Sequence, residues 1–157
     1  NMPAKINFTE QEERNIALAK EYMRIAYSPE ESKGAESVRH LVAENSEMVA
    51  PSTFPECKTL LDYADSHRTV MDAVNDLSIT SYDYVFAKDN MVLLRYSASG
   101  THKGKPHKDI QPTGRKASWH AAAIFEVEDG KLKKFVKEWD KLLMWTQFGW
   151  NRGADLV

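Results

Sequence analysis

The chain has 157 residues, of which 42% are hydrophobic and 28% charged, so its composition is that of an ordinary globular domain. Its formal net charge of −2 argues against the strongly basic surface of a nucleic-acid or membrane-surface binder. We therefore expect one domain over residues 1–157, with an ordered core at about 9–149 and a loose tail at 150–157, and we expect no nucleic-acid or membrane partner.

The cysteine and histidine content limits the possible sites. Cys57 is the only cysteine, so an internal disulfide and a cysteine-based metal cluster are excluded. No two histidines show metal-ligand spacing with a nearby acid, and we expect no metal. The first residues lack the apolar core of a signal peptide, which together with the single thiol favours a cytoplasmic setting.

The first half of the chain has helical patterning. Thr9 and Glu12 have the spacing of a capping box and predict a helix that begins there. A second helix is expected over 35–42 and a third over 59–77. A short strand is expected between them at 46–50.

After residue 77 the hydrophobic pattern changes to the alternation of β-strands. A hairpin signal at Glu128-Asp129-Gly130 joins the last two strands. Helices followed by a mostly antiparallel meander predict an α+β fold. The expected strands are 79–87, 91–99, 117–127 and 132–139, with a long basic connection at 100–116 and a closing helix at 142–148.

Alternation assigns faces within each strand. Trp119, Ala121 and Ala123 share one face, and His120 lies on the other. The small alanines leave room for a ligand if this face lines a pocket. The alternative is tight packing against a helix.

The neighbouring strands carry polar residues whose faces remain open at this stage. Arg95 and Ser97 share a face, and Lys137 lies opposite Glu138 and Asp140. Sequence alone does not align one strand's faces with another's, and a single bulge would exchange them.

Several short motifs follow one another along the second half of the chain, and in their order and spacing the chain resembles SnoaL-like members of the nuclear-transport-factor-2-like superfamily. The helical first half fits the same pattern, so that the resemblance covers most of residues 9–149. The motifs are Arg95-Tyr96-Ser97-Ala98-Ser99-Gly100-Thr101-His102-Lys103-Gly104, Pro112-Thr113-Gly114-Arg115, Glu128-Asp129-Gly130-Lys131-Leu132, Trp139-Asp140 and Gln147-Phe148-Gly149.

The resemblance implies three N-terminal helices on a strongly curved, mostly antiparallel sheet, which together form a cone-shaped half-barrel with an internal pocket. Relatives include polyketide cyclases, limonene-epoxide hydrolase, ketosteroid isomerase and scytalone dehydratase, which mostly work without a metal or organic cofactor. It also implies a homodimer formed through the outer face of the sheet, where His120 would lie.

The resemblance also maps known functional positions onto this chain. The carboxylate that acts as acid or base in the cyclases falls at Lys137, and their histidine falls at Ala123. The Arg-x-Asp pair of the epoxide hydrolase falls on Arg95 and Ser97, where serine replaces the aspartate.

Four residues are the candidate catalytic groups. Arg95 and Lys137, if both point inward, would bind an anionic oxygen, or Lys137 would act as a base with a depressed pKa. The alternative is that Lys137 reaches solvent or pairs with an acid. Glu138 and Asp140 would form an acid–base pair if a bulge turned them inward. Otherwise Asp140 caps the helix that follows.

A further set of residues is expected to line a ligand pocket, although aromatic residues at such spacing also build ordinary cores. His67 is a candidate for the pocket mouth, and His102 is expected to be solvated. The expected pocket residues are Tyr22, Tyr63, Ser97, Trp119, Ala121, Ala123, Trp139 and Trp145.

These features lead to a functional hypothesis. We expect a cofactor-independent isomerase, cyclase or lyase that moves protons on a small, largely apolar or weakly anionic oxygenated molecule. The alternative is a non-catalytic ligand-binding or dimeric scaffold module of the same fold.

Overall fold

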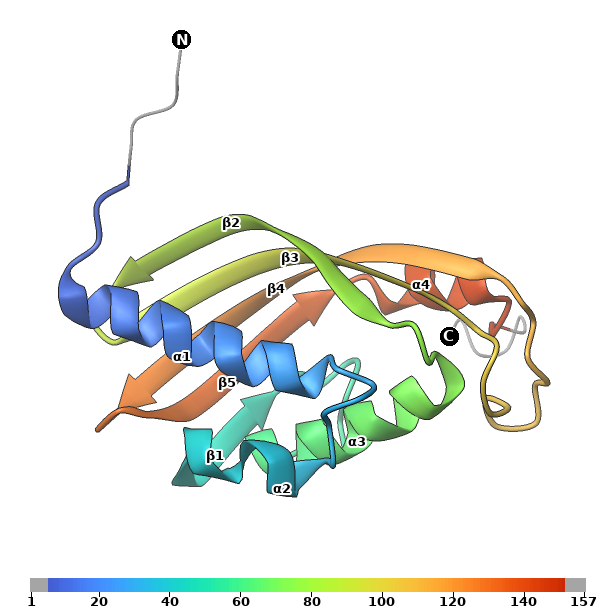
Figure 1. The fold of residues 1–157 in the computed structure, drawn as a ribbon, viewed down its shortest axis with the longest axis horizontal. Coiled ribbons are helices and arrows are strands. Elements are labelled where there is room, and N and C mark those ends of the chain that lie inside the picture. The colour runs from blue at the N-terminus through green and yellow to red at the C-terminus, as the bar shows by residue number, and fades with distance from the viewer. Residues whose placement is uncertain (1–5, 152–157) are drawn as a thin grey trace, which may run out of the picture.

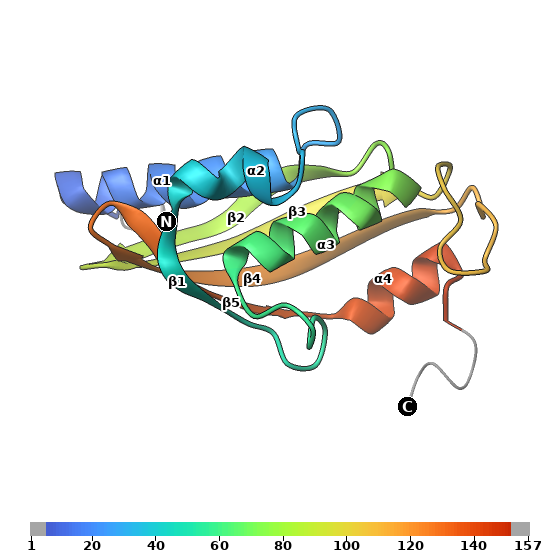
Figure 2. The same cartoon turned by 90° about the horizontal axis from the view of Figure 1, so that it is seen from below.

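The computed structural model describes residues 6–151. Five strands form one sheet in the order β1-β5-β4-β3-β2, and helices α1 and α3 lie across one face of it (Figure 1, Figure 2). All neighbouring strands are antiparallel except β1 and β5, which are parallel. This confirms the α+β prediction. The elements are α1 Glu10–Ala26, α2 Ala35–Val38, the 3₁₀ helix η1 Arg39–Leu41, β1 Val42–Val49, α3 Leu60–Ala73, β2 Ser78–Lys88, β3 Met91–Thr101, β4 Lys116–Glu128, β5 Lys131–Trp139 and α4 Lys141–Phe148.

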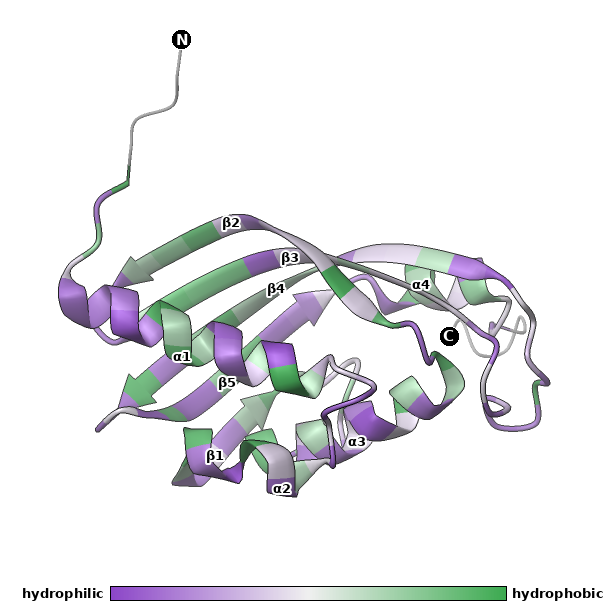
Figure 3. Cartoon of the chain, in the orientation of Figure 1, coloured by the Kyte–Doolittle hydropathy of each residue, from purple (hydrophilic) through white to green (hydrophobic). Residues whose placement is uncertain are grey.

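Both long helices begin at capping boxes. The Thr9 side chain accepts a hydrogen bond from the Glu12 amide, while the Glu12 carboxylate accepts one from the Thr9 amide, as predicted. Thr59 and Asp62 make the same pair of bonds at α3. Helix α1 is amphipathic (Figure 3), with one side buried against the sheet.

The predicted second helix is much shorter than expected. Helix α2 has four residues, a 3₁₀ turn follows, and Val42 already belongs to β1. The reason is tertiary, because β1 pairs with β5 from Val42 opposite Leu132 onward. Asn45, with φ of 55°, lies where this pairing shifts register. The strand that was expected only from residue 46 therefore starts four positions earlier.

The register of the central strands fixes which side chains face the helices. Strands β3 and β4 pair without interruption, so that Leu94 lies opposite Ala123 and Tyr96 opposite Ala121. All four side chains are buried. The predicted inward face of β4 is confirmed, and His120 lies on the opposite, outer face.

The predicted loose tail is partly wrong. Trp150 is buried, and its indole N–H donates to His102 Nδ1 at 3.0 Å. His102 is therefore a fully buried structural residue and not the solvated one that was expected. Residues 152–157 of the predicted tail lie outside the described residues. None of the described helices is long and apolar enough to cross a membrane.

Candidate active site

Lys137 projects into the interior, as one of the two sequence interpretations required. It lies on β5 opposite Ala123 of β4 and shares the inward face with Phe135. Only 2% of its surface is exposed. The inward orientation follows from alternation with Phe135, which lies two residues earlier on β5 and is buried in the core, after the register shift that separates it from Leu132.

Tyrosine hydroxyls hold the Lys137 amine. Its Nζ donates to Tyr63 Oη at 3.0 Å and to Tyr27 Oη at 3.1 Å. The Tyr27 hydroxyl lies 2.7 Å from that of Tyr96 and 3.3 Å from that of Tyr63. We call Tyr27, Tyr63, Tyr96 and Lys137 the lysine–tyrosine cluster. It joins the end of α1, α3, β3 and β5.

Aromatic rings surround this amine. Its Nζ lies 4.4 Å from the ring centroid of Trp139 and 5.2 Å from that of Phe54, within cation–π range. No acidic side chain among residues 6–151 forms an ion pair with it. Burial lowers the pKa of Lys137, and the neighbouring Tyr27 opposes that shift in part. At a given pH, the neutral form of this amine is consequently more populated than that of an exposed lysine.

A neutral histidine, His67, lies next to the cluster. Burial, and secondarily the charge of Lys137, lower the pKa of His67 to about 3. Its Nδ1 lies 2.7 Å from the Ala26 carbonyl oxygen, which fixes Nδ1 as the protonated nitrogen. The ring stacks on Tyr63. His67 is thus buried behind the cluster, and the expectation that it lines a pocket mouth is wrong.

Arg95 does not share the interior with Lys137. It and Ser97 lie on the outer face of β3, whose inner face carries Tyr96 and Ala98. Arg95 Nη1 donates to Asp83 Oδ2 at 3.0 Å, and Ser97 Oγ lies 2.7 Å from the same oxygen. The expected inward pair of cations and the expected pocket role of Ser97 are therefore wrong.

The two acidic candidates are also outside the cluster. Glu138 is exposed on the outer face of β5, opposite Ala122. Asp140 Oδ1 accepts the Leu143 amide at 2.9 Å and caps α4, which was the alternative interpretation. Residues Val136 to Trp139 of β5 pair with Ile124 to Ala121 of β4 without a bulge, so neither carboxylate is turned inward.

Most of the predicted pocket residues instead fill the core. Trp119, Ala121 and Ala123 are buried on the inward face of β4, and Tyr22 donates to the Leu60 carbonyl oxygen at 2.6 Å. Trp139 and Trp145 line a cavity at the other end of α3, described below. Sequence reasoning missed Tyr27 and Tyr96. Tyr27 lies one residue past α1. Tyr96 directly follows Arg95 on β3 and therefore faces inward, where Arg95 had been expected.

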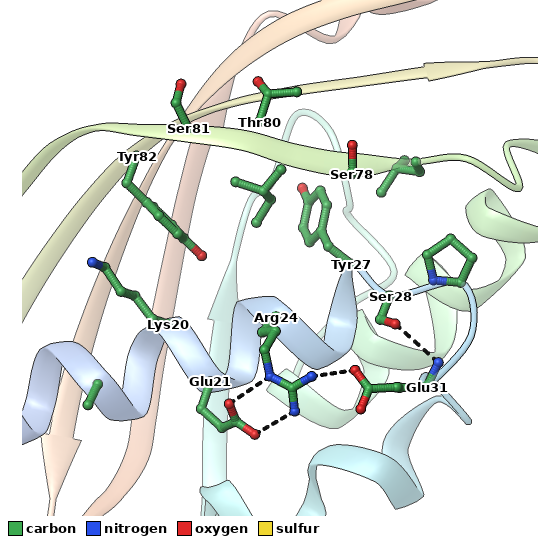
Figure 4. Close-up of a pocket in the computed structure, with 14 residues that line it drawn as sticks. Lys20, Glu21, Arg24, Tyr27, Ser28, Glu31, Ser78, Thr80, Ser81 and Tyr82 are labelled. Atoms are coloured by element: carbon green, nitrogen blue, oxygen red, sulfur yellow. Dashed lines mark hydrogen bonds and ion pairs between the residues drawn. The ribbon is translucent and has the colours of Figure 1, made fainter.

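A groove of about 570 Å³ runs between α1 and the edge strand β2 (Figure 4). Tyr27 lies at its inner wall, while Lys20 and Tyr82 stand at its side, with Lys20 Nζ 5.0 Å from the Tyr82 ring centroid. Arg24, bound to Glu21 and Glu31, closes the helix side. We call this the α1–β2 groove. The groove therefore extends from solvent to Tyr27, the side chain that is hydrogen-bonded to Lys137.

The described residues offer no metal site, since no three His, Cys, Asp or Glu side chains of residues 6–151 lie close enough together to hold an ion. The ionisable groups that converge in the interior are the amine, the phenols and one imidazole. Such a set moves protons and donates hydrogen bonds to oxygen.

The fold defines the class of protein. The curved five-stranded sheet covered on one face by α1 and α3 is the α+β cone of NTF2-like proteins, and one of these from Burkholderia xenovorans matches with a TM-score of 0.64 at 16% identity, over 87% of this chain and 96% of its own. The family model for SnoaL-like polyketide cyclases matches residues 18–148. The chain belongs to the SnoaL-like polyketide cyclase family, which confirms the resemblance drawn from the sequence.

Other solved structures share this fold. TsrD from Streptomyces laurentii matches with a TM-score of 0.68 at 20% identity, over 92% of this chain and 100% of its own. A "putative SnoaL-like polyketide cyclase" from Jannaschia sp. CCS1 matches with a TM-score of 0.76 at 11% identity, over 94% and 100% of the two chains. No curated protein matches the sequence. At these identities the structures establish the fold alone.

Proposed function

We propose that this chain is an isomerase or cyclase that acts on a small carbonyl compound by proton transfer, with the Lys137 amine as the base. The observation that carries this proposal is the buried amine whose hydrogen-bond partners are tyrosine hydroxyls at 3.0 and 3.1 Å. Membership of a family described as polyketide cyclases supports a reaction of this class.

The proposed reaction begins when the neutral amine removes a proton from the carbon next to the substrate's carbonyl group. The electron pair moves onto the carbonyl oxygen, and the hydroxyls of Tyr63 and Tyr27 stabilise the resulting enolate by hydrogen bonds. Return of the proton to another carbon isomerises the substrate. Attack of the enolate carbon on a second carbonyl of the same molecule closes a ring, after which the lysine ammonium protonates the new alkoxide.

The α1–β2 groove is the proposed route of entry. Its lining combines the apolar Leu77 and Ile79 with the polar edge of Tyr82, which suits a largely apolar molecule that carries oxygen. Tyr27 is only 4% exposed and separates the groove from Lys137. Rotation of this one side chain would connect the two, so Tyr27 acts in this proposal both as a donor and as a gate.

Proton exchange tests the proposal without knowledge of the natural substrate. Indanone and tetralone are incubated in D₂O with the protein, and loss of the proton signal next to the carbonyl is followed by NMR. We expect Lys137→Met to lower the enzymatic exchange rate about 100-fold or more, the size typical of a lost acid–base group. Tyr63→Phe, which keeps the ring, is expected to lower it about 100-fold through loss of the oxyanion donor.

A lysine on the surface of the same strand provides the matched control. Lys134 lies on the outer face of β5, where its Nζ is 3.7 Å from the carboxylate of Glu47 on β1. The variant Lys134→Met should leave the exchange rate unchanged. Equal exchange by wild type and Lys137→Met would refute the assignment of the base.

Ligand binding without turnover is the second candidate function. It is favoured by the closure of the interior, because aromatic side chains fill the space around the Lys137 amine. A wild-type protein that binds indanone in calorimetry but gives no exchange above the buffer rate would support this function and contradict the enzymatic one.

We also propose a homodimer through the outer face of the sheet. Tyr84 and Phe86 of β2 are 58% and 47% exposed there, and their rings stack on each other. An apolar pair of this kind is suited to an interface. Sedimentation of wild type against Tyr84→Ser/Phe86→Ser tests it, and a wild-type monomer at micromolar concentration would contradict it.

A further inference from the structure

A second, smaller cavity lies at the end of the molecule where α4 approaches α3. Its volume is about 290 Å³, close to the lower end of the roughly 300–1,000 Å³ typical of small-molecule sites. The loop before α3, the connection after β3, and α4 with the residue that follows its cap all contribute to its walls. We call it the aromatic cavity.

The walls of the aromatic cavity are flat and apolar. Phe54 and Trp139 stack with their ring centroids 6.0 Å apart and an angle of 17° between the rings. Trp145 and Trp150 meet edge to face at 6.1 Å. Stacked and perpendicular rings of this kind bind planar π-systems favourably.

Two lysines give this cavity a positive rim. Lys141 Nζ donates to the Thr53 carbonyl oxygen at 3.1 Å and lies 4.8 Å from the Trp145 ring centroid. Lys108 Nζ lies 5.2 Å from the same centroid. Among the described residues that line the cavity, Glu56 is the one with an acidic side chain. Burial lowers the pKa of Lys141, so its ammonium gains from an anion brought close to it.

The walls also contain polar atoms without partners. Thr53 Oγ1 and Trp139 Nε1 are buried and have no hydrogen-bond partner among the described residues, although both residues line the cavity. A buried donor that lacks a partner is costly to leave unsatisfied and calls for an explanation. An indole N–H is a donor only, so the group that satisfies it must be an acceptor.

We propose that the aromatic cavity binds a planar aromatic carboxylate. Its ring would lie against Phe54 and the tryptophans, and its carboxylate would accept hydrogen bonds from Lys141, Thr53 and Trp139. Because both orphan atoms are shielded from solvent, binding requires Phe54 or Lys141 to move aside, and the ligand replaces the contacts that are lost.

This site is distinct from the α1–β2 groove and does not depend on catalysis at Lys137. Phe54 and Trp139 contact the Lys137 amine and the aromatic cavity alike, so they form the partition between the two. A carboxylate seated in the cavity would therefore lie near the cluster without occupying it.

Naphthoate is a suitable probe, with naphthalenemethanol as its neutral counterpart. We expect calorimetry to show that the protein binds naphthoate at least about 10-fold more tightly than the alcohol, since the alcohol lacks the charge. In ¹H–¹⁵N spectra the indole N–H resonance that is absent from Trp139→Phe should shift on addition of naphthoate. Lys141→Met should remove the preference for the anion, whereas Lys134→Met should keep it.

Thr53→Val separates a binding role from a purely structural one. The change replaces the hydroxyl by a methyl group of similar shape, so the melting temperature should stay the same or rise. If the hydroxyl serves a ligand, the same variant binds naphthoate about 5-fold more weakly. Three results would each overturn the proposal. These are naphthoate binding by Thr53→Val and Trp139→Phe that is as tight as that of wild type, equal affinity of wild type for naphthoate and the alcohol, and no binding of naphthoate at all.

Discussion

Replacing Lys137 by methionine is expected to stabilise the fold while it abolishes proton transfer. Methionine keeps a chain of similar length on the inward face of β5 but removes an amine that is 2% exposed. No tyrosine loses its last partner, because the Tyr27 hydroxyl keeps that of Tyr96 at 2.7 Å and that of Tyr63 at 3.3 Å. The variant therefore removes a desolvation cost and leaves no orphan group.

The magnitude follows from two opposing terms. Exchange of a buried ion pair for apolar residues of similar volume is often neutral or stabilises by about 1–4 kcal/mol, and Lys137 lacks even the acidic partner of such a pair among residues 6–151. The cation–π contacts that are lost, with Trp139 at 4.4 Å foremost, contribute about 2 kcal/mol at most when desolvated. We expect a net gain of about 1–2 kcal/mol at neutral pH, which corresponds to a rise of about 2–8 °C in melting temperature for a chain of this size.

The gain should depend on pH in a defined direction. Because the folded-state pKa of Lys137 is lowered below 10.5, the unfolded chain binds more protons than the folded chain between the two values. Wild-type stability therefore rises with pH through that window. The advantage of Lys137→Met is full below the folded pKa of Lys137 and disappears as the pH approaches 10.5.

Urea unfolding of both proteins over a series of pH values measures this difference directly. Lys134→Met is the control, since it removes two surface ion pairs, with Glu47 and Glu126, each worth about 0–1 kcal/mol, and should show no such trend. A Lys137→Met protein that is less stable than wild type by the same amount at every pH would show that proton binding at Lys137 does not differ between the folded and the unfolded chain, and would refute the argument that the amine is held at a cost.

Three further predictions concern structural positions. Asp140→Ala should lower the free energy of unfolding by about 0.5–2 kcal/mol in urea titrations, because the Leu143 amide loses its cap, while Asp140→Asn should retain most of it. Gly104→Ala should lower the melting temperature, since a Cβ there would collide with the Asp72 carbonyl oxygen; an unchanged melt would mean that the connection can move. His67 should stay neutral down to about pH 3, and because its pKa is lowered, wild-type stability should fall as the pH drops from 6.5 toward 3. An NMR titration of its ring with a midpoint near 6.5 would contradict this.

Alternation and capping signals predicted much of this fold. The faces of β4, the hairpin at Gly130, the capping box at Thr9 and the cap at Asp140 are all local features that a sequence states directly. The extent of β1 was not predictable in this way. Its first residues are assigned by pairing with β5, which is a contact distant in sequence.

The candidate site was predicted only in part, for a similar reason. The position of the cyclases' carboxylate, carried over by the resemblance, placed Lys137 inside, as the structure has it. The position of the epoxide hydrolase's arginine placed Arg95 inside as well, although the apolar Leu94 and Tyr96 occupy the other face of its strand, and in the structure these apolar residues are the ones that face inward. Tyr27 belongs to no sequence motif and could not be predicted, because its role depends on contacts between the end of α1 and three other elements.

The parallel pairing of β1 with β5 has a consequence for the order in which this chain assembles. The backbone of β1 is bound by side chains of β5 that lie far along the sequence, as when Lys133 Nζ reaches the Glu44 carbonyl oxygen 89 positions away. Closing so long a loop is entropically expensive, so contacts of this type slow folding. During synthesis β1 emerges well before its neighbour exists, and the sheet acquires this edge only after β5 has been made.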